Sequence, residues 1–234
     1  NPRLTPYRYN GFWLPNFGLL PGSAAIDGGW MNNCADVQVN HVDQRNMPRP
    51  LNTVCDIGAF ESQEFILAIT GGNNQSTDIN TAFTDPLQVS VTPVNPDELV
   101  DGGIVKFYPV PSSAGAVITG SPAVISGGFA SVTATANGTA GAYQIFTQTE
   151  GSTGAVLFDL ENLPACSNAI TVTNANDSGA GSLRQAMLDI CPDGTITFNN
   201  DYQVYLLSPL SPAKDMTIDA TGRIIILNGD NTSD

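Results

Sequence analysis

The acidic and arginine side chains near the N-terminus are the residues best placed to do chemistry in this 234-residue chain. A glycoside hydrolase needs paired carboxylates in a groove. A polysaccharide lyase needs a base, commonly arginine or lysine, beside an acidic cluster that binds calcium. Candidates for these roles are Asp27, Asp36, Asp43, Asp56, Arg45 and Arg49. We expect these side chains to hydrogen-bond loop backbone and to pair with one another. A calcium ion at Asp36 and Asp43 is the alternative.

Other reactive residue types are scarce. His41 is the sole histidine, and Lys106 and Lys214 are the only lysines. This scarcity argues against a histidine-based catalytic triad and against a metal site with several histidines. We expect His41 to be a loop residue and Arg184 to be a solvated or acid-paired surface residue. The protein is therefore predicted not to be an enzyme and to hold no cofactor.

Five aromatic side chains near the N-terminus offer a different chemistry, because aromatic rings can stack against sugars. They are Tyr7, Tyr9, Trp13, Phe17 and Trp30. Aromatic residues more often fill a core or a subunit interface. We favour that structural role here and keep sugar binding as the alternative.

The overall charge narrows the range of partners. The chain has 8 Lys+Arg against 22 Asp+Glu, which gives a net charge of −14. Nucleic-acid binding needs a basic surface and is not expected. No apolar run approaches the roughly 18–20 residues of a membrane span. The chain opens with Asn1-Pro2-Arg3, so we expect a processed product or a piece of a longer protein.

The four cysteines suggest the cellular compartment. They are Cys34, Cys55, Cys166 and Cys191, which form two local pairs without any CxxC spacing. In a lysine-poor, acidic chain rich in strand-forming residues, this pattern predicts two disulfides and an oxidising, extracellular setting. Free buried thiols are the alternative.

The elements that must position these residues fall into three parts: 1–61, 62–163 and 164–234. The first part is irregular and rich in proline, asparagine and glycine. The second alternates apolar and polar residues with regular turns, and we expect strands at 87–92, 103–110, 129–136, 142–149 and up to Leu160. Roughly seven strands in about 95 residues is typical of an immunoglobulin-like sandwich.

The third part begins with a short amphipathic helix. Apolar residues recur with helical spacing from Leu183 to Ile190, and Ser182 with Gln185 forms a capping box. Short strands are expected at 195–198, 204–207, 216–219 and 224–227. Their spacing alone also fits a sandwich.

Three segments resemble known bacterial families. The middle part, with its ANGTAGAY turn, resembles the bacterial Ig-like (Big, invasin-type) repeats, which usually act as spacers. TVTNANDSGAGSLRQAMLDICPDGTITF (171–198) is similar to the opening of right-handed parallel β-helix proteins with the CSLREAI motif. In that family the helix caps the first coil, and a Cys166–Cys191 bond would pin it.

The first part resembles the choice-of-anchor closing segment of secreted β-helix proteins. The matching elements are PGSAAIDGG (21–29), DQR (43–45), RP (49–50) and CDIGAFE (55–61). YRYNGFWLPNFG departs from the polar stretch usual before them. The expected fold is therefore all-β, with an Ig-like sandwich between two partial right-handed parallel β-helix segments and one short capping helix.

Each of the two partial β-helix segments would expose an apolar end and unpaired strand edges. We therefore expect another part of a chain to pack against each of them. The C-terminal part of one subunit could stack on the N-terminal part of the next, which generates a filament. The two ends could also meet within one chain, or the chain could belong to a longer array of modules. We expect a secreted or cell-surface structural protein that forms a head-to-tail homopolymer. The alternative is a carbohydrate-binding or polysaccharide-cleaving surface protein.

Overall fold

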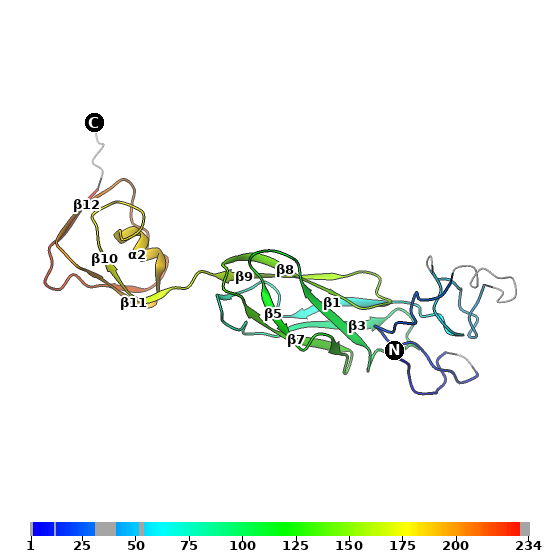
Figure 1. Cartoon of the computed structure of the whole chain (residues 1–234). Coiled ribbons are helices and arrows are strands. Elements are labelled where there is room, and N and C mark those ends of the chain that lie inside the picture. The colour runs from blue at the N-terminus through cyan, green and yellow to red at the C-terminus, as the bar shows by residue number, and fades with distance from the viewer. Residues whose placement is uncertain (1, 12, 31–40, 52–53, 230–234) are drawn as a thin grey trace. The chain divides into compact units, whose positions relative to one another are not determined.

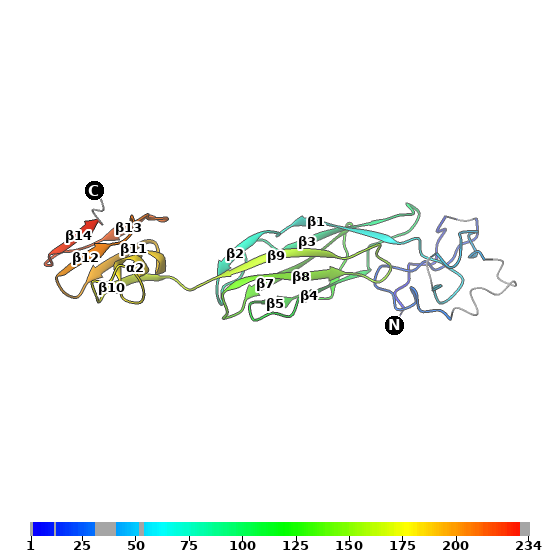
Figure 2. The ribbon, with the colours of Figure 1, turned by 90° about the horizontal axis from the view of Figure 1, so that it is seen from above.

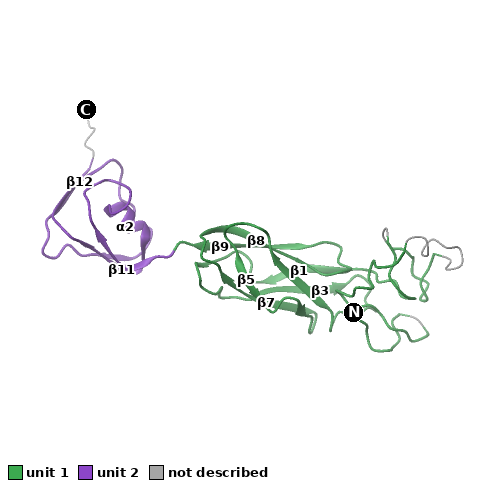
Figure 3. Cartoon of the chain, in the orientation of Figure 1, with its two compact units in different colours: residues 1–164 green, residues 165–234 purple. Residues whose placement is uncertain are grey.

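The computed structural model describes residues 2–11, 13–30, 41–51 and 54–229. The chain forms two compact units, residues 1–164 and 165–234 (Figure 3). The regular elements of the described residues are strands and one short helix, α2 (Leu183–Asp189). This confirms the predicted all-β class.

The first unit contains two sheets. One has the order β1 (Phe65–Gly71), β3 (Leu87–Pro93), β7 (Phe129–Ala136) and β5 (Ala116–Thr119), with all neighbours antiparallel. The other has the order β2 (Gln75–Asp78), β9 (Val156–Leu163), β8 (Gly141–Gln148), β4 (Ile104–Pro109) and β6 (Ala123–Val124). In this second sheet β2 pairs with β9 in parallel, and the remaining pairs are antiparallel. Figure 2 shows the strands of this unit running lengthwise.

One hydrophobic core joins the two sheets. In β3, Leu87 and Val89 are buried while Gln88 between them is partly exposed, because successive side chains of a strand point to opposite faces. They belong to the same apolar cluster as Ile145 of β8 and Phe158 of β9. The strands predicted from sequence alternation agree with β3, β4, β7 and β8 to within a residue or two.

Residues 1–64, hereafter the N-terminal segment, belong to the first unit. Its described part is made of loops joined by antiparallel bridges, Leu4 to Leu19, Arg8 to Asn16 and Val42 to Pro48. The expected closing coils of a β-helix would pair in parallel, so the described residues of this segment differ from that expectation. The segment is anchored on the second sheet, since the Ile104 amide donates to the Pro21 carbonyl at 2.9 Å.

The second unit is a stack of parallel strands. β10 (Ser167–Val172), β11 (Ile190–Phe198) and β13 (Met216–Ile218) form one sheet, and β12 (Tyr202–Leu206) and β14 (Ile225–Gly229) form another. In Figure 1 the chain circles round this unit and α2 lies inside the outline. One turn of the chain supplies β11 and β12, and the next supplies β13 and β14.

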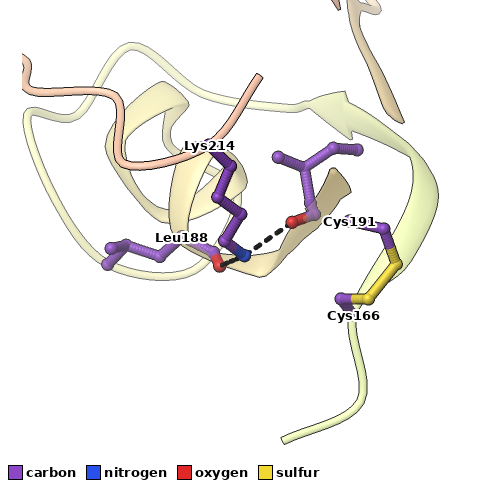
Figure 4. The surroundings of a disulfide bond; sticks show 5 residues. Cys166, Leu188, Cys191 and Lys214 are labelled. Atoms are coloured by element: carbon purple, nitrogen blue, oxygen red, sulfur yellow. Dashed lines mark hydrogen bonds between the residues drawn. A yellow bond between two sulfur atoms is a disulfide. The ribbon is translucent and has the colours of Figure 1, made fainter. Parts of the chain in front are cut away.

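Helix α2 closes one end of the stack. Ser182 Oγ accepts a hydrogen bond from the Gln185 amide at 3.2 Å, as the capping pattern predicts. The apolar side of the helix, with Leu183 and Met187, packs with Ile196 of β11 in a second core. The predicted disulfide between Cys166 and Cys191 is present, with the two Cα atoms 4.9 Å apart (Figure 4).

Lys214 holds the C-terminal end of α2. Its Nζ donates to the carbonyl oxygens of Leu188, at 2.8 Å, and Ile190, at 2.7 Å (Figure 4). The last carbonyls of a helix lack partners within the helix, and a cation there also interacts favourably with the helix dipole.

We therefore expect Lys214→Met to loosen α2. A loss of about 1 kcal/mol of local stability would speed amide exchange over residues 183–190 about fivefold. Hydrogen exchange followed by mass spectrometry measures this. Arg223→Met, at an exposed position of the same unit, is the control and should leave the exchange unchanged. Equal exchange in the two variants would contradict the role given to Lys214.

Candidate functional site

The guanidinium of Arg45 is the centre of a buried charge network. Its Nε lies 2.8 Å from Asp43 Oδ2 and its Nη1 lies 3.0 Å from Glu98 Oε1, and each of the three side chains is at most 1% exposed. Nη2 donates to the carbonyl oxygen of Glu61. The guanidinium carbon Cζ lies over the Phe60 ring, 3.5 Å from its centre. Arg45 therefore fixes the position of Phe60 and its neighbours by charge, hydrogen bonds and a cation–π contact.

Glu98 connects this network to the sheets, because it lies in the loop between β3 and β4. Its carboxylate accepts hydrogen bonds from Ser62 Oγ at 3.1 Å and from the Gln63 amide at 3.1 Å. Burial raises the pKa of Glu98, although Arg45 and these donors act in the opposite direction. The pair thus joins the N-terminal segment to a loop of the sandwich through a desolvated ion pair.

Asp43 organises the loop that carries Arg45. Its Oδ1 accepts from the amides of Arg45 and Met47, at 2.7 and 3.1 Å, and its Oδ2 accepts from the Glu61 amide at 3.0 Å. With Arg45 Nε, four N–H donors fill the acceptor positions of the carboxylate. Asp36, the other residue of the predicted calcium site, lies outside the described residues. Among the residues that the structure describes, no group of His, Cys, Asp and Glu is arranged to hold a metal ion.

Asp56 ties three parts of the N-terminal segment together. Its Oδ1 accepts from the Asp27 amide at 2.8 Å and its Oδ2 accepts from the Ser62 amide at 2.6 Å. Glu61 in turn accepts from the Asp56 amide at 3.0 Å, and Arg49 Nε lies 3.6 Å from the same Glu61 carboxylate. The carboxylate oxygens of Asp56 and Glu61 thus accept hydrogen bonds from backbone amides.

The carboxylates outnumber the cations in this region. Asp27, Asp56, Glu61 and Glu64 line a pocket of about 40 Å³. Burial raises the pKa of Asp56 to about 7, and it also raises the pKa values of Asp27 and Glu61. A second cause for Asp27 is the nearby charge of Glu64. The amides of Ser62 and Asp27 act in the opposite direction on the pKa of Asp56, but burial outweighs them, so Asp56 binds its proton more tightly than an exposed aspartate does.

These networks favour a structural role for the acidic and arginine residues that the sequence singled out. Asp43, Arg45 and Asp56 are buried, so they present no reactive group to a polymeric substrate. His41 is exposed in a loop. Arg184 pairs with Asp177 at 2.7 Å and donates to the Ser208 carbonyl at 2.7 Å. Cys55 is buried, and its predicted bond to Cys34 stays a prediction because Cys34 lies outside the described residues.

An apolar groove lies in the N-terminal segment, and we call it the aromatic groove. It has a volume of about 420 Å³, and its walls include Leu4, Tyr7, Phe17, Ile57 and Phe60. The rings of Tyr7 and Phe17 pack with their centres 5.2 Å apart. None of the described residues that line it is charged. The other three aromatic residues predicted for this surface, Tyr9, Trp13 and Trp30, are highly exposed and do not line the groove.

A second apolar surface lies at the end of the parallel stack away from α2. Ile196 of β11 is 0% exposed, whereas Ile218, its register partner in β13, is 46% exposed. Val204 of β12 is 0% exposed, whereas Leu227, its partner in β14, is 46% exposed. The side chains at these inward-pointing positions are therefore buried in β11 and β12 and exposed in β13 and β14. We call the surface formed by Ile218, Leu227 and the edges of β13 and β14 that pair with no other described strand the open face.

No protein-family model matches the chain, and no curated protein matches it either. Within the described residues, no helix has the length and apolar character needed to cross a membrane.

The Arg45 network should dominate the stability of the N-terminal segment. Arg45→Met leaves Asp43 and Glu98 buried without their cation, so we expect a loss of about 3–5 kcal/mol. Hydrogen exchange of the amides of residues 41–51 and 61–63, followed by mass spectrometry, suits this test, because it reports the free energy of opening of this segment directly. Arg8→Met, at a more exposed arginine, is the control and should change stability little. A loss below about 1 kcal/mol for Arg45→Met would contradict the network's role.

The acidic pocket should make the first unit more stable in mild acid than in base. Asp56 has a raised pKa in the folded state, so the folded chain binds a proton that the unfolded chain releases between about pH 4 and 7. Stability conferred by this proton is present below the unfolded pKa and lost as the pH rises through about 7. We expect about 1–2 kcal/mol between pH 5.5 and 8. Asp56→Asn should reduce this difference in urea unfolding, whereas Asp85→Asn, at an exposed residue, should preserve it.

Proposed function

We propose that the protein is a structural subunit or module of an extracellular fibre or surface layer that assembles head to tail. In this proposal residues 165–234 are the helix-capped opening coils of a right-handed parallel β-helix. Residues 65–163 are an Ig-like spacer. The N-terminal segment of the next copy covers the open face and thereby completes the β-helix between two chains.

The observation that carries the proposal is the difference in exposure between successive turns of the stack. Ile218 and Leu227 are the register partners of Ile196 and Val204 in the next turn of the chain. Their side chains are 46% exposed, whereas Ile196 and Val204 are 0% exposed. Full burial of one such side chain stabilises by roughly 1.5–3 kcal/mol. A further turn of chain on the open face would supply this burial and would pair the strand edges.

The two ends of the stack differ, and this sets the direction of assembly. One end is closed by α2, with Lys214 and the disulfide beside it. A joint at the other end brings two different surfaces together, so it is heterologous. A heterologous contact that does not close on itself continues into a filament. The disulfide supports an oxidising, extracellular setting for such a filament.

A second candidate function is carbohydrate binding or polysaccharide cleavage at a cell surface. The aromatic groove favours it, because Tyr7 and Phe17 present adjacent rings to solvent. The buried state of Asp43 and Asp56 weighs against the cleaving version, since a hydrolase needs carboxylates that reach the substrate.

Assembly can be tested with two variants of one strand. Leu227 and Ile226 are neighbours in β14 and are 46% and 47% exposed, but Leu227 pairs with buried Val204 and Ile226 pairs with exposed Gln203. Wild type should form polymers whose size rises with concentration in light scattering, with filaments in electron micrographs. Leu227→Asp should abolish the polymers, and Ile226→Asp should retain them.

A wild-type chain that stays monomeric at high micromolar concentration would overturn the proposal. Polymers of undiminished size from Leu227→Asp would overturn it equally. Amide exchange over α2 checks that Leu227→Asp keeps the capped end of the stack folded.

A further inference from the structure

We infer that the disulfide between Cys166 and Cys191 carries tension past the first elements of the second unit, and that its reduction makes these elements the first part of this unit to unfold under load. The elements are β10 and α2, which lie between the two cysteines, and we call residues 167–190 the cap segment. The inference rests on the proposed function, because a fibre subunit is a chain under tension. It adds a redox-controlled response to that tension.

Tension that passes from the first unit to the second enters the second unit near Cys166. The boundary lies between Pro164 and Ala165, so Cys166 is the second residue of the second unit, and β10 begins at the next residue. The disulfide joins Cys166 to Cys191, the second residue of β11 (Figure 4). It keeps the two Cα atoms 4.9 Å apart, so the cap segment cannot be stretched while the bond is intact.

The disulfide therefore changes which strand bears the load. β11 lies between β10 and β13 in its sheet, whereas β10 pairs with β11 alone among the described strands. With the bond intact, tension reaches β11, which is paired on both sides. Without the bond, tension reaches β10 and acts on a single ladder that begins at the register pair Ser167 and Ile190. An element with fewer partners opens at a lower free energy than the rest of its unit.

Non-covalent bonds also hold the cap segment to the stretch of chain between β12 and β13. The guanidinium of Arg184 donates to the carbonyl oxygens of Ser208 and Pro209, at 2.7 and 2.9 Å. Lys214 Nζ holds the C-terminal end of α2 in the same way. The Arg184 side chain is partly exposed, so water competes for its bonds. After reduction, the load would fall on these bonds and on the apolar contacts of α2.

The disulfide is also accessible to a reductant. Cys166 and Cys191 are both partly exposed, whereas the apolar residues of α2 that face the core, including Leu183 and Met187, are buried. Thiol–disulfide exchange requires an attacking thiolate to reach one of the two sulfur atoms. The bond can therefore be opened while the core of the unit stays folded.

Single-molecule force spectroscopy of the full chain, held at its two ends, tests the inference. In the Cys166→Ser/Cys191→Ser variant, a separate step should appear at forces where the wild-type second unit shows none. The cysteines are 25 residues apart, and each extended residue spans at most about 3.3–3.6 Å, so this step should release a contour length of about 80 Å. Wild type in reductant should show the same step. Cys34→Ser/Cys55→Ser is the control and should unfold its second unit as wild type does.

Arg184→Met distinguishes a load on the cap segment from a general loss of stability. In the Cys166→Ser/Cys191→Ser background, it should speed the opening of the cap segment at constant force about fivefold or more. In the disulfide-bonded chain, it should leave the unfolding rate of the second unit nearly unchanged, because the cap segment bears no load there. Arg223→Met, at an exposed arginine of the same unit, is the matched control and should change neither rate.

Three results would overturn the inference. The first is a Cys166→Ser/Cys191→Ser variant whose second unit unfolds in one step at the wild-type force. The second is equal acceleration by Arg184→Met in the bonded and unbonded chains, since the cap segment would then bear load in both. The third is a wild-type chain in which reductant produces no additional step.

These results are independent of the test of assembly, because each molecule is stretched alone. If wild type polymerises but the additional step is absent, only the inference fails. If wild type stays monomeric and the step appears on reduction, the assembly proposal fails and the path of tension through the disulfide stands.

Discussion

The desolvated guanidinium of Arg45 is the constraint on which the first unit depends. A buried cation must meet its hydrogen-bonding and charge requirements inside the protein, and Arg45 does so through Asp43, Glu98 and the Glu61 carbonyl. The described part of the N-terminal segment has isolated β-bridges instead of continuously paired strands. Hydrogen bonds between side chains and backbone therefore help to hold its loops. Glu98 carries the same network across to the sheets. The geometry of the aromatic groove follows, because Phe60 lies between Arg45 and the groove wall.

The second unit buries its apolar side chains by stacking parallel strands, and the outermost described strands are covered on one side only. Each turn of parallel strands covers the apolar positions of the turn before it, as Ile196 covers Ile170 in the register. Helix α2 replaces the missing turn at the first end with its own apolar side. At the second end the described strands leave Ile218 and Leu227 without such cover. The difference between the two ends comes from topology, because a stack of parallel strands buries its inward-pointing side chains only between neighbouring turns.

Sequence reasoning found the elements whose signal is local and missed the contacts whose partners are distant. Strand alternation located β3 and β7, and the Ser182 cap located α2. The Cys166–Cys191 bond followed from short spacing. The partnership of Arg45 with Glu98 spans 53 residues, and Glu98 lies in a polar loop that reads as solvent-exposed. Lys214 at the end of α2 was missed for the same reason, since nothing in the local sequence marks it as a helix partner. The prediction that Asp43 and Arg45 hold loop backbone and each other agrees with their contacts, although their burial beside Glu98 depends on tertiary structure.

In the proposed head-to-tail assembly, polymer formation and chain stability would be linked through the burial of apolar side chains. The described residues leave Ile218 and Leu227 46% exposed, whereas their register partners Ile196 and Val204 are 0% exposed. A heterologous joint that covers the open face would leave one free end on each side of the assembly, so each added chain would form one buried joint and would offer a new end for growth. Because parallel pairing with β11 and β12 already fixes β13 and β14, such a joint would need little ordering of the open face, and its free energy would go mainly into cohesion between subunits.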